Sequence, residues 1–175
     1  MIIDQYLLTE NLVIRNAYSE DLPALEWNGE LERFRFLYQD VYRSSLRGEA
    51  VMWIAEHKLE GVIGQLFVQL LSLRKELADG WKRAYIYGFR VQPGFRGRGV
   101  GSQMLQVAET DLARRGFALV SLNVSRENES ARKLYERNGY TVVAAEPGNW
   151  SYVDHEGKRQ QVYEPAWRME KIIGG

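Results

Sequence analysis

A glycine- and arginine-rich segment, residues 96–101 (Arg-Gly-Arg-Gly-Val-Gly), constrains the fold of this 175-residue chain more than any other feature. It follows a predicted strand over 84–91 and opens a helix whose apolar face is predicted from the spacing of Val100, Met104 and Leu112. The first N–H groups of a helix have no intrahelical partners and carry partial positive charge, so they suit a phosphate or pyrophosphate. Glycine lets the backbone approach such an anion, and arginine matches its oxygens. We therefore predict an anion-binding turn between a strand and a helix.

Two common phosphate-binding motifs do not fit this segment. A Walker loop requires Gly-Lys-Ser/Thr, which is missing. A dinucleotide fingerprint requires a third glycine where Ser102 stands and an acid at the end of the next strand, which here ends Leu-Asn-Val at 122–124. Taken alone, the segment also fits a glycine-rich turn with solvated arginines, and both interpretations stay open at this point.

The pattern of apolar residues along the rest of the chain predicts one α/β domain. Strands are predicted at 12–15, 51–56, 61–71, 84–91, 117–124, 140–144 and about 161–169, and helices at about 19–47 (interrupted at Gly29), 100–115 and 128–138. The Asp79-Gly80 turn predicts a hairpin between the strands on either side of it. This order is that of a mixed sheet with helices packed on it, and no linker or repeat divides it.

Composition excludes several classes of site. The chain has no cysteine, so it has no disulfide and no thiolate nucleophile, and two histidines are too few for a multi-histidine metal cage. The 23 basic and 23 acidic side chains argue against a nucleic-acid or membrane partner. We expect a cytoplasmic location, because the sequence shows neither a secretory signal nor a long apolar run.

A second motif follows the glycine-rich segment, and together they resemble the GCN5-related N-acetyltransferase (GNAT) family. The residues that carry the likeness are Val91-x-Pro93, Arg96-x-x-Gly99-x-Gly101 and Asn128-x-x-Ala131-x-x-Leu134-Tyr135-x-x-x-Gly139-Tyr140. The opening stretch 12–17, followed by Asp-Leu-Pro at 21–23, is also similar to the start of this family. The likeness covers nearly the whole chain and is densest from Val91 to Tyr140.

The resemblance implies a mixed, mostly antiparallel central sheet, flanked by about four helices and splayed between its fourth and fifth strands, 84–91 and 117–124. Residues 1–175 would form a single N-acetyltransferase domain, with a cofactor-binding core at about 84–144. The acceptor side would lie at about 20–50 and 145–160. Acetyl-CoA would be the co-substrate, an amine the acceptor, and no metal would be required. A homodimer is compatible with this assignment.

The resemblance also implies roles for single residues. The backbone of Phe89, Arg90 and Val91 would pair with the pantetheine arm, and the Val91 N–H would bind the oxyanion. Tyr135 would be the general acid that protonates the leaving thiolate. The implied cofactor contacts are Phe89, Arg90, Val91, Arg96, Gly97, Arg98, Gly99, Val100, Gly101, Ser102, Asn128, Ala131 and Tyr135. Tyr135 also fits a plain core aromatic, and Asn128 also fits a helix cap.

The general base is unassigned. Some relatives have a glutamate in the strand before the asparagine motif, whereas this chain has Asn123, which cannot accept a proton usefully. Candidates near the predicted splay are Glu56, Tyr85, Tyr87 and Glu146. A route through water, or an amine that arrives deprotonated, would also serve. His57 and His155 are expected to be solvated turn residues.

The balanced charge is the sum of unequal parts. Residues 1–60 carry 6 basic and 11 acidic side chains, and residues 90–137 carry 9 and 5. The basic part coincides with the coenzyme motifs. The acidic part contains the aromatic segment 22–47, and this segment together with 147–159 would suit a cationic amine. The aromatic residues also fit a hydrophobic core, and the acidic residues also fit a solvated surface.

Three functional hypotheses follow. The first is an acetyl-CoA-dependent N-acetyltransferase for a small amine or a peptide N-terminus. The second is a non-catalytic acyl-CoA-binding or regulatory module on the same fold. The third is nucleotide or phosphate binding by the glycine-rich segment alone.

Overall fold

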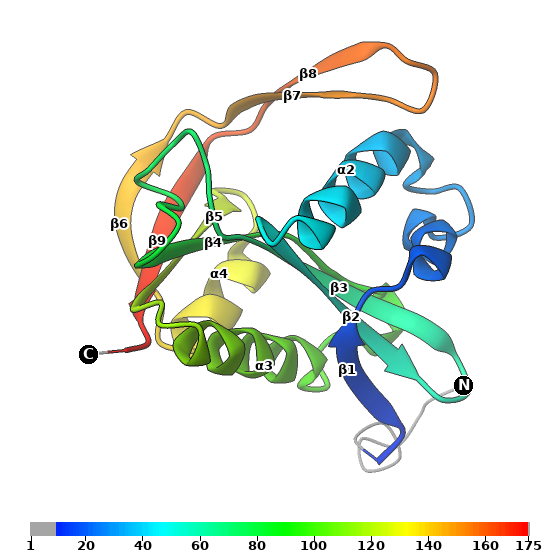
Figure 1. Cartoon of the computed structure of the whole chain (residues 1–175), viewed down its shortest axis with the longest axis horizontal. Helices are drawn as coiled ribbons and strands as arrows, with labels where there is room; N and C mark the ends of the chain where they lie inside the picture. Colours follow the sequence, from blue (N-terminus) through cyan, green and yellow to red (C-terminus); the bar gives the residue numbers. More distant parts are fainter. Residues whose placement is uncertain (1–9, 175) are drawn as a thin grey trace.

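The computed structural model describes residues 10–174 and contains a seven-stranded sheet with helices on both faces (Figure 1). The sheet order is β1-β2-β3-β4-β5-β9-β6, and β7 and β8 form a separate two-stranded sheet. The strands are β1 Leu12–Asn16, β2 Ala50–His57, β3 Gly61–Gln69, β4 Arg83–Val91, β5 Leu119–Ser125, β6 Thr141–Glu146, β7 Asn149–Val153, β8 Arg159–Tyr163 and β9 Ala166–Ile172. The helices are α2 Arg35–Leu46, α3 Val100–Arg114 and α4 Glu129–Arg137, with 3-10 helices η1 Ser19–Glu26, η2 Glu32–Phe34 and η3 Pro93–Phe95. The predicted mixed, mostly antiparallel sheet is confirmed.

Two apolar cores cover the two faces of the sheet. Helix α3 buries residues at three- and four-residue spacings, and with α4 it packs on one face (Figure 1). On the other face, η1, η2 and α2 cover Met52, Ile54 and Phe67. A helix on each face accounts for the burial of both sides of β2 and β3.

The predicted splay lies between β4 and β5. These strands are parallel and pair only from Arg83, opposite Leu119, to Ile86, opposite Leu122. Strand β4 continues to Val91 without a β5 partner, so its backbone groups on that side face an opening. The opening lies at the carboxyl end of both strands, where ligands bind in open α/β sheets.

A bulge in β4 reverses the faces of the side chains beyond it. Gln65 of β3 opposes Arg90, whereas Phe67 opposes Tyr87, so β4 holds one residue more than β3 in this interval. Gly88 takes the left-handed conformation there, with φ of +59°. Before the bulge, Ala84 and Ile86 belong to the α3 core, whereas after it Phe89 and Val91 contact that core. Arg90 consequently points to the α2 side, where Tyr87 also lies.

The segment predicted as one interrupted helix is a series of shorter ones. Trp27, Asn28 and Gly29 are all left-handed, with φ of 49°, 57° and 96°, and this run ends η1 before η2 and α2 begin. Gly29 lies within the break, as predicted, but the break extends over residues 27–31. No apolar periodicity distinguishes the 3-10 turn of η1 from an α-helical turn over so short a stretch.

The C-terminal third contains the largest difference from the sequence-based prediction. The stretch 147–159, in which the sequence predicts no strand, forms most of the β7–β8 hairpin, and the single strand predicted at 161–169 is divided into β8 and β9. Pro165 separates these two strands because it has no N–H to donate to a ladder. The Asp79-Gly80 hairpin is confirmed, and Asp79 Oδ1 accepts hydrogen bonds from the N–H groups of residues 81–83.

The N-terminal stretch used to predict the lack of a secretory signal falls mainly in residues 1–9, outside the described part of the chain. Within residues 10–174, every helix is too short or too polar to cross a bilayer.

Candidate active site

Tyr135 and Phe89 meet at the opening between β4 and β5. Tyr135 projects from α4 and is only 7% exposed, and its ring centroid lies 6.2 Å from Phe89 and 6.0 Å from Tyr140. Burial raises the pKa of the Tyr135 hydroxyl well above its usual range, and the neighbouring Tyr85 raises it further. The hydroxyl therefore stays protonated at neutral pH, as a proton donor must.

The Val91 peptide faces the same opening. The N–H of Gln92 donates to the Ile63 carbonyl on β3 at 2.8 Å. Because neighbouring residues of a strand direct their N–H groups to opposite sides, the Val91 N–H and C=O point away from β3. The Arg96 Nε donates to the Val91 carbonyl at 2.8 Å, which agrees with this direction.

The turn before α3 has the features of a phosphate site. Gly97 and Gly99 have φ of +74° and +84°, and a Cβ on either would meet nothing within 4 Å, so the space beside them is open. The first intrahelical bond runs from the Gln103 N–H to the Gly99 carbonyl, so the N–H groups of residues 100–102 precede the ladder. The first turn has no acidic residue. These donors fit the pyrophosphate of acetyl-CoA.

Gly101 serves a different purpose from the other glycines of the turn. A Cβ on it would lie 3.2 Å from Leu134 Cδ2 and 3.4 Å from Phe89 Cζ. It therefore allows the start of α3 to approach α4 and β4 closely. Ser102, expected at the pyrophosphate, accepts a hydrogen bond from Asn138 Nδ2 at 3.1 Å and so also links α3 to the end of α4.

Asn128 caps α4. Its Oδ1 accepts a hydrogen bond from the Ala131 N–H at 3.1 Å, and its side chain is exposed. The capping interpretation is thus confirmed, and a contact with the pantetheine arm, which the cap does not exclude, stays a prediction, as it does for Ala131.

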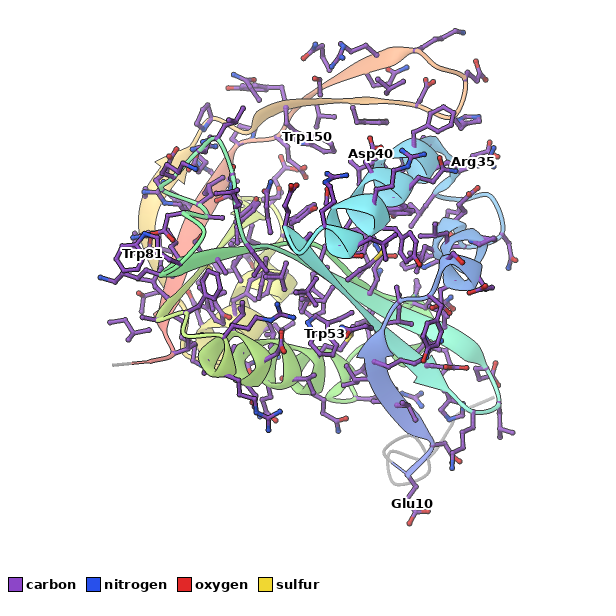
Figure 2. All side chains as sticks on the ribbon, in the orientation of Figure 1. Glu10, Arg35, Asp40, Trp53, Trp81 and Trp150 are labelled. Atoms are coloured by element: carbon purple, nitrogen blue, oxygen red, sulfur yellow. The ribbon has the colours of Figure 1, made fainter. Side chains whose placement is uncertain are left out.

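The two segments predicted for the acceptor side come together on the α2 face. Phe34 lies with its ring centroid 6.4 Å from Trp150 and 4.9 Å from Tyr152, both on β7. Figure 2 shows Trp150 on the side of the hairpin that faces α2. Tyr85 and Tyr87 of β4 face the same side and stack with an interplanar angle of 3°. An aromatic surface therefore joins the hairpin, η2 and β4, and Phe34 at its base is itself buried, as the core interpretation predicts.

Each of the four candidate bases is either a protonated tyrosine or a carboxylate that binds an arginine. Burial raises the pKa of Tyr85 to about 12 and that of Tyr87 still further, so both are protonated at neutral pH. Glu56 accepts from Arg15 at 2.8 Å and lies on β2, which β3 separates from β4. The buried Glu146 lies near the opening, but two arginines already bind it, Arg74 and Arg168.

Asn123 lies on β5, and its Oδ1 is buried without a hydrogen-bond partner in residues 10–174. Burial raises the pKa of Tyr85, and an interaction with the Asn123 side chain opposes this rise. The side chains of Asn123 and Tyr85 are therefore close together. Arg74 and Arg168 could not be predicted from the sequence as partners of Glu146, because they lie 72 and 22 positions away from it along the chain.

The expectation for His57 was wrong. Its side chain is buried, with 1% exposed, and its Nδ1 accepts hydrogen bonds from the N–H groups of Leu59 and Glu60. Strand β2 runs one residue further than predicted, so the following turn folds over the ring. The His155 side chain is 25% exposed and its Nε2 lies 3.4 Å from Glu32, so it joins the hairpin to η2. Residues 10–174 contain no cluster of three His, Cys, Asp or Glu side chains able to hold a metal.

Comparison with known proteins gives one consistent result. The sequence signature described as "Acetyltransferase (GNAT) family" matches residues 13–140. A mycothiol acetyltransferase from Beutenbergia cavernae is 46% identical over 95 residues, which make up 54% of this chain and 30% of that protein. The matching part of the chain thus spans less than a third of the length of this relative.

Two solved structures share the fold. The ribosomal-protein-S18-alanine N-acetyltransferase from Escherichia coli superposes with a TM-score of 0.69 at 18% identity, over 94% of this chain and 95% of that one. A ribosomal L7/L12 alpha-N-protein acetyltransferase in complex with coenzyme A gives 0.68 at 20% identity, over 94% and 96%. At these identities, the likeness concerns the fold alone.

Proposed function

This chain belongs to the acetyltransferase (GNAT) family, and on that premise we propose that it transfers an acetyl group from acetyl-CoA to a primary amine. One observation carries the proposal. Beside the end of β4 that has no β5 partner, the buried Tyr135 contacts Phe89, the Val91 carbonyl points away from β3, and the glycine-rich turn before α3 follows. A complete set of donors around one opening is what transfer from a thioester with a phosphorylated handle requires.

Acetyl-CoA, when bound, supplies an activated acetyl group: the amine nitrogen forms a bond to the carbonyl carbon, and the carbon–sulfur bond breaks. The N–H of Val91 would donate to the acetyl oxygen, where negative charge develops. Tyr135 would give its proton to the sulfur and recover one from solvent. The N–H groups of residues 100–102, with Arg96 and Arg98, would hold the pyrophosphate.

The acceptor would enter from the aromatic α2 face, opposite Tyr135. Primary amines are mostly protonated at pH 7, so the ammonium group is itself the cation that the acidic N-terminal part suggested. With every candidate base occupied or protonated, we propose that the amine loses its proton to water near Tyr85 and Asn123 before attack. The E. coli structure belongs to a protein named for an alanine of ribosomal protein S18. Both small amines and peptide N-termini stay within the proposal.

A direct assay tests this function. The protein is incubated with acetyl-CoA and a panel of amines and N-terminal peptides, and both thiol release and the acetylated product mass are measured. We expect release only with an acceptor, and strongly reduced release in Tyr135→Phe. Coenzyme A binding without turnover over the whole panel would instead support the non-catalytic module, and protection against unfolding by ATP but not by coenzyme A would support simple phosphate binding. Cytoplasmic location and a homodimer stay predictions, and solution mass tests the latter.

A further inference from the structure

Arg90 is a half-buried cation on the acceptor side of β4. It directly precedes Val91, and the bulge at Gly88 turns its side chain toward α2. Its guanidinium carbon lies 5.4 Å from the centroid of Phe34, the ring that also contacts Trp150 and Tyr152. Arg90 therefore reaches into the aromatic surface where the acceptor would lie.

Arg90 differs in its partners from four arginines that bind carboxylates. Arg15, Arg35, Arg74 and Arg168 each bind a carboxylate of the chain. Within residues 10–174, no carboxylate forms an ion pair with Arg90. A guanidinium packed on an aromatic ring still exposes a planar edge of N–H donors, which matches a carboxylate in two parallel hydrogen bonds.

A second donor lies beside it. Tyr38 of α2 is 2% exposed, and its hydroxyl is buried without a hydrogen-bond partner in the described part of the chain. Gln65 first, and then Arg90, oppose the rise in the Tyr38 pKa that burial causes, so the hydroxyl is close to both side chains. A buried hydroxyl without a partner is costly, and an incoming acceptor oxygen would remove that cost.

The acidic residues of the N-terminal part do not neutralise this cation. Five of the eleven carboxylates of this part bind arginines of the same segment, in the pairs Asp21–Arg15, Glu56–Arg15, Glu26–Arg35, Asp40–Arg43 and Glu49–Arg47. Glu32 lies 3.4 Å from His155 instead. Arg90 is thus the half-buried cation of the aromatic surface, and Arg33 lies over the same Phe34 ring from the exposed side.

We propose that the acceptor carries a carboxylate close to its amine, and that Arg90, supported by Phe34 and Tyr38, binds this carboxylate. The inference rests on the proposed acetyl transfer and names its substrate class. Because Arg90 and Val91 are adjacent, the carboxylate and the reacting amine are separated by no more than the reach of one arginine side chain. A free amino acid meets this requirement, and so does a peptide whose first residue is acidic.

Matched acceptors test the proposal. L-phenylalanine, L-phenylalaninamide and 2-phenylethylamine share one ring and one amine but differ in the carboxylate. The dipeptide amides Asp-Phe and Asn-Phe differ only in a side-chain carboxylate. They therefore test a peptide acceptor with an acidic first residue, whereas the first set tests a free amino acid. We expect kcat/KM at least about tenfold higher for the carboxylate member of one of these sets.

Arg90→Met keeps the packing and removes the charge, and it should abolish this preference. Arg33→Met is the control, because Arg33 also lies over Phe34, at 4.5 Å, but is exposed. Arg33→Met should keep the preference. Circular dichroism confirms that both variants fold.

A binding measurement separates this inference from the proposed function. Calorimetry records the heat of L-phenylalanine and of Asp-Phe amide binding to the coenzyme A complex, with and without Arg90. If neutral acceptors react as well as carboxylates and Arg90→Met changes nothing, acetyl transfer stands and the carboxylate proposal is overturned. If no acceptor reacts, the transferase proposal fails, and calorimetry alone decides: Arg90-dependent binding of the carboxylates supports this inference, and its lack overturns it.

Discussion

Tyr135 of α4 and Phe89 of β4 face each other across the opening between two diverging parallel strands, with ring centroids 6.2 Å apart. Phe89 occupies this position because the bulge at Gly88 turns it from the α2 face to the α3 face. One extra residue in β4 thus brings together Tyr135, the proposed acid, and the Val91 backbone, the proposed oxyanion donor.

Tyr135→Phe should lower kcat by about 100-fold while leaving the KM for acetyl-CoA nearly unchanged, because it removes a proton donor and keeps the ring. Since burial and Tyr85 raise the pKa of Tyr135, its deprotonation should cause no loss of wild-type kcat below about pH 10. Tyr140→Phe is the control, since Tyr140 is equally buried and contacts Tyr135. Equal losses in both variants would make Tyr135 a packing residue.

Gly88→Ala should destabilise the protein by about 3 kcal/mol or more, because the new Cβ would lie 2.4 Å from Phe67 Cδ2 at a left-handed residue. Gly61→Ala isolates the backbone contribution: Gly61 has φ of +76° with nothing within 4 Å, so about 1 kcal/mol is expected. Urea unfolding measures both. Similar losses would show that Phe67 moves aside freely.

Arg96→Met should raise the KM for acetyl-CoA about tenfold, the equivalent of one charge-assisted hydrogen bond to phosphate. Acetyl-pantetheine, which has no pyrophosphate, should react equally well with wild type and variant. Arg96 also donates to the Val91 carbonyl. A loss of kcat with both acetyl donors would therefore assign its effect to the position of Val91 and contradict the phosphate role.

Asp21→Asn should cost about 2 kcal/mol of stability at pH 7. Asp21 is 8% exposed and accepts two hydrogen bonds from Arg15 and one from the Tyr18 N–H. Arg15 first, and then Tyr18, hold the pKa of Asp21 below its usual value, so this stability is complete above about pH 4 and is lost as the pH falls through the lower folded-state pKa.

Urea unfolding of wild type and Asp21→Asn at pH 7 and near pH 2 measures this dependence, and the difference should shrink in acid. Asp40→Asn is the control, because the exposed pair of Asp40 with Arg43 should contribute about 0.5 kcal/mol or less. A difference between wild type and Asp21→Asn that does not change with pH would contradict the assignment to the ion pair.

The fold was predictable because its signals are local. The strand before the glycine-rich turn, the helix after it and the cap at Asn128 each follow from a few neighbouring residues, and the structure contains all three. The β7–β8 hairpin was not predictable in this way. Its strands are short and mostly exposed, so they lack the alternation of buried and exposed residues that identifies a strand.

The candidate site was predictable only where motif and geometry coincide. Tyr135 is named by its motif, whereas the direction of the Arg90 side chain depends on a bulge that is defined by pairing with β3. Likewise, Glu146 appeared to be a free carboxylate until the fold brought Arg74 and Arg168 to it. Contacts between distant segments decide these cases, and the sequence of either segment alone does not contain them.

Strands β7 and β8 pair only with each other, in an excursion between β6 and β9 (Figure 1). Lengthening or replacing this hairpin would break no hydrogen bond of the seven-stranded sheet. The end of β4 and the turn before α3, where acetyl-CoA is proposed to bind, would therefore keep their structure. The seven-stranded sheet and the hairpin can therefore change independently of each other, and if the hairpin contacts the proposed acceptor, exchanging it alone should change acceptor preference.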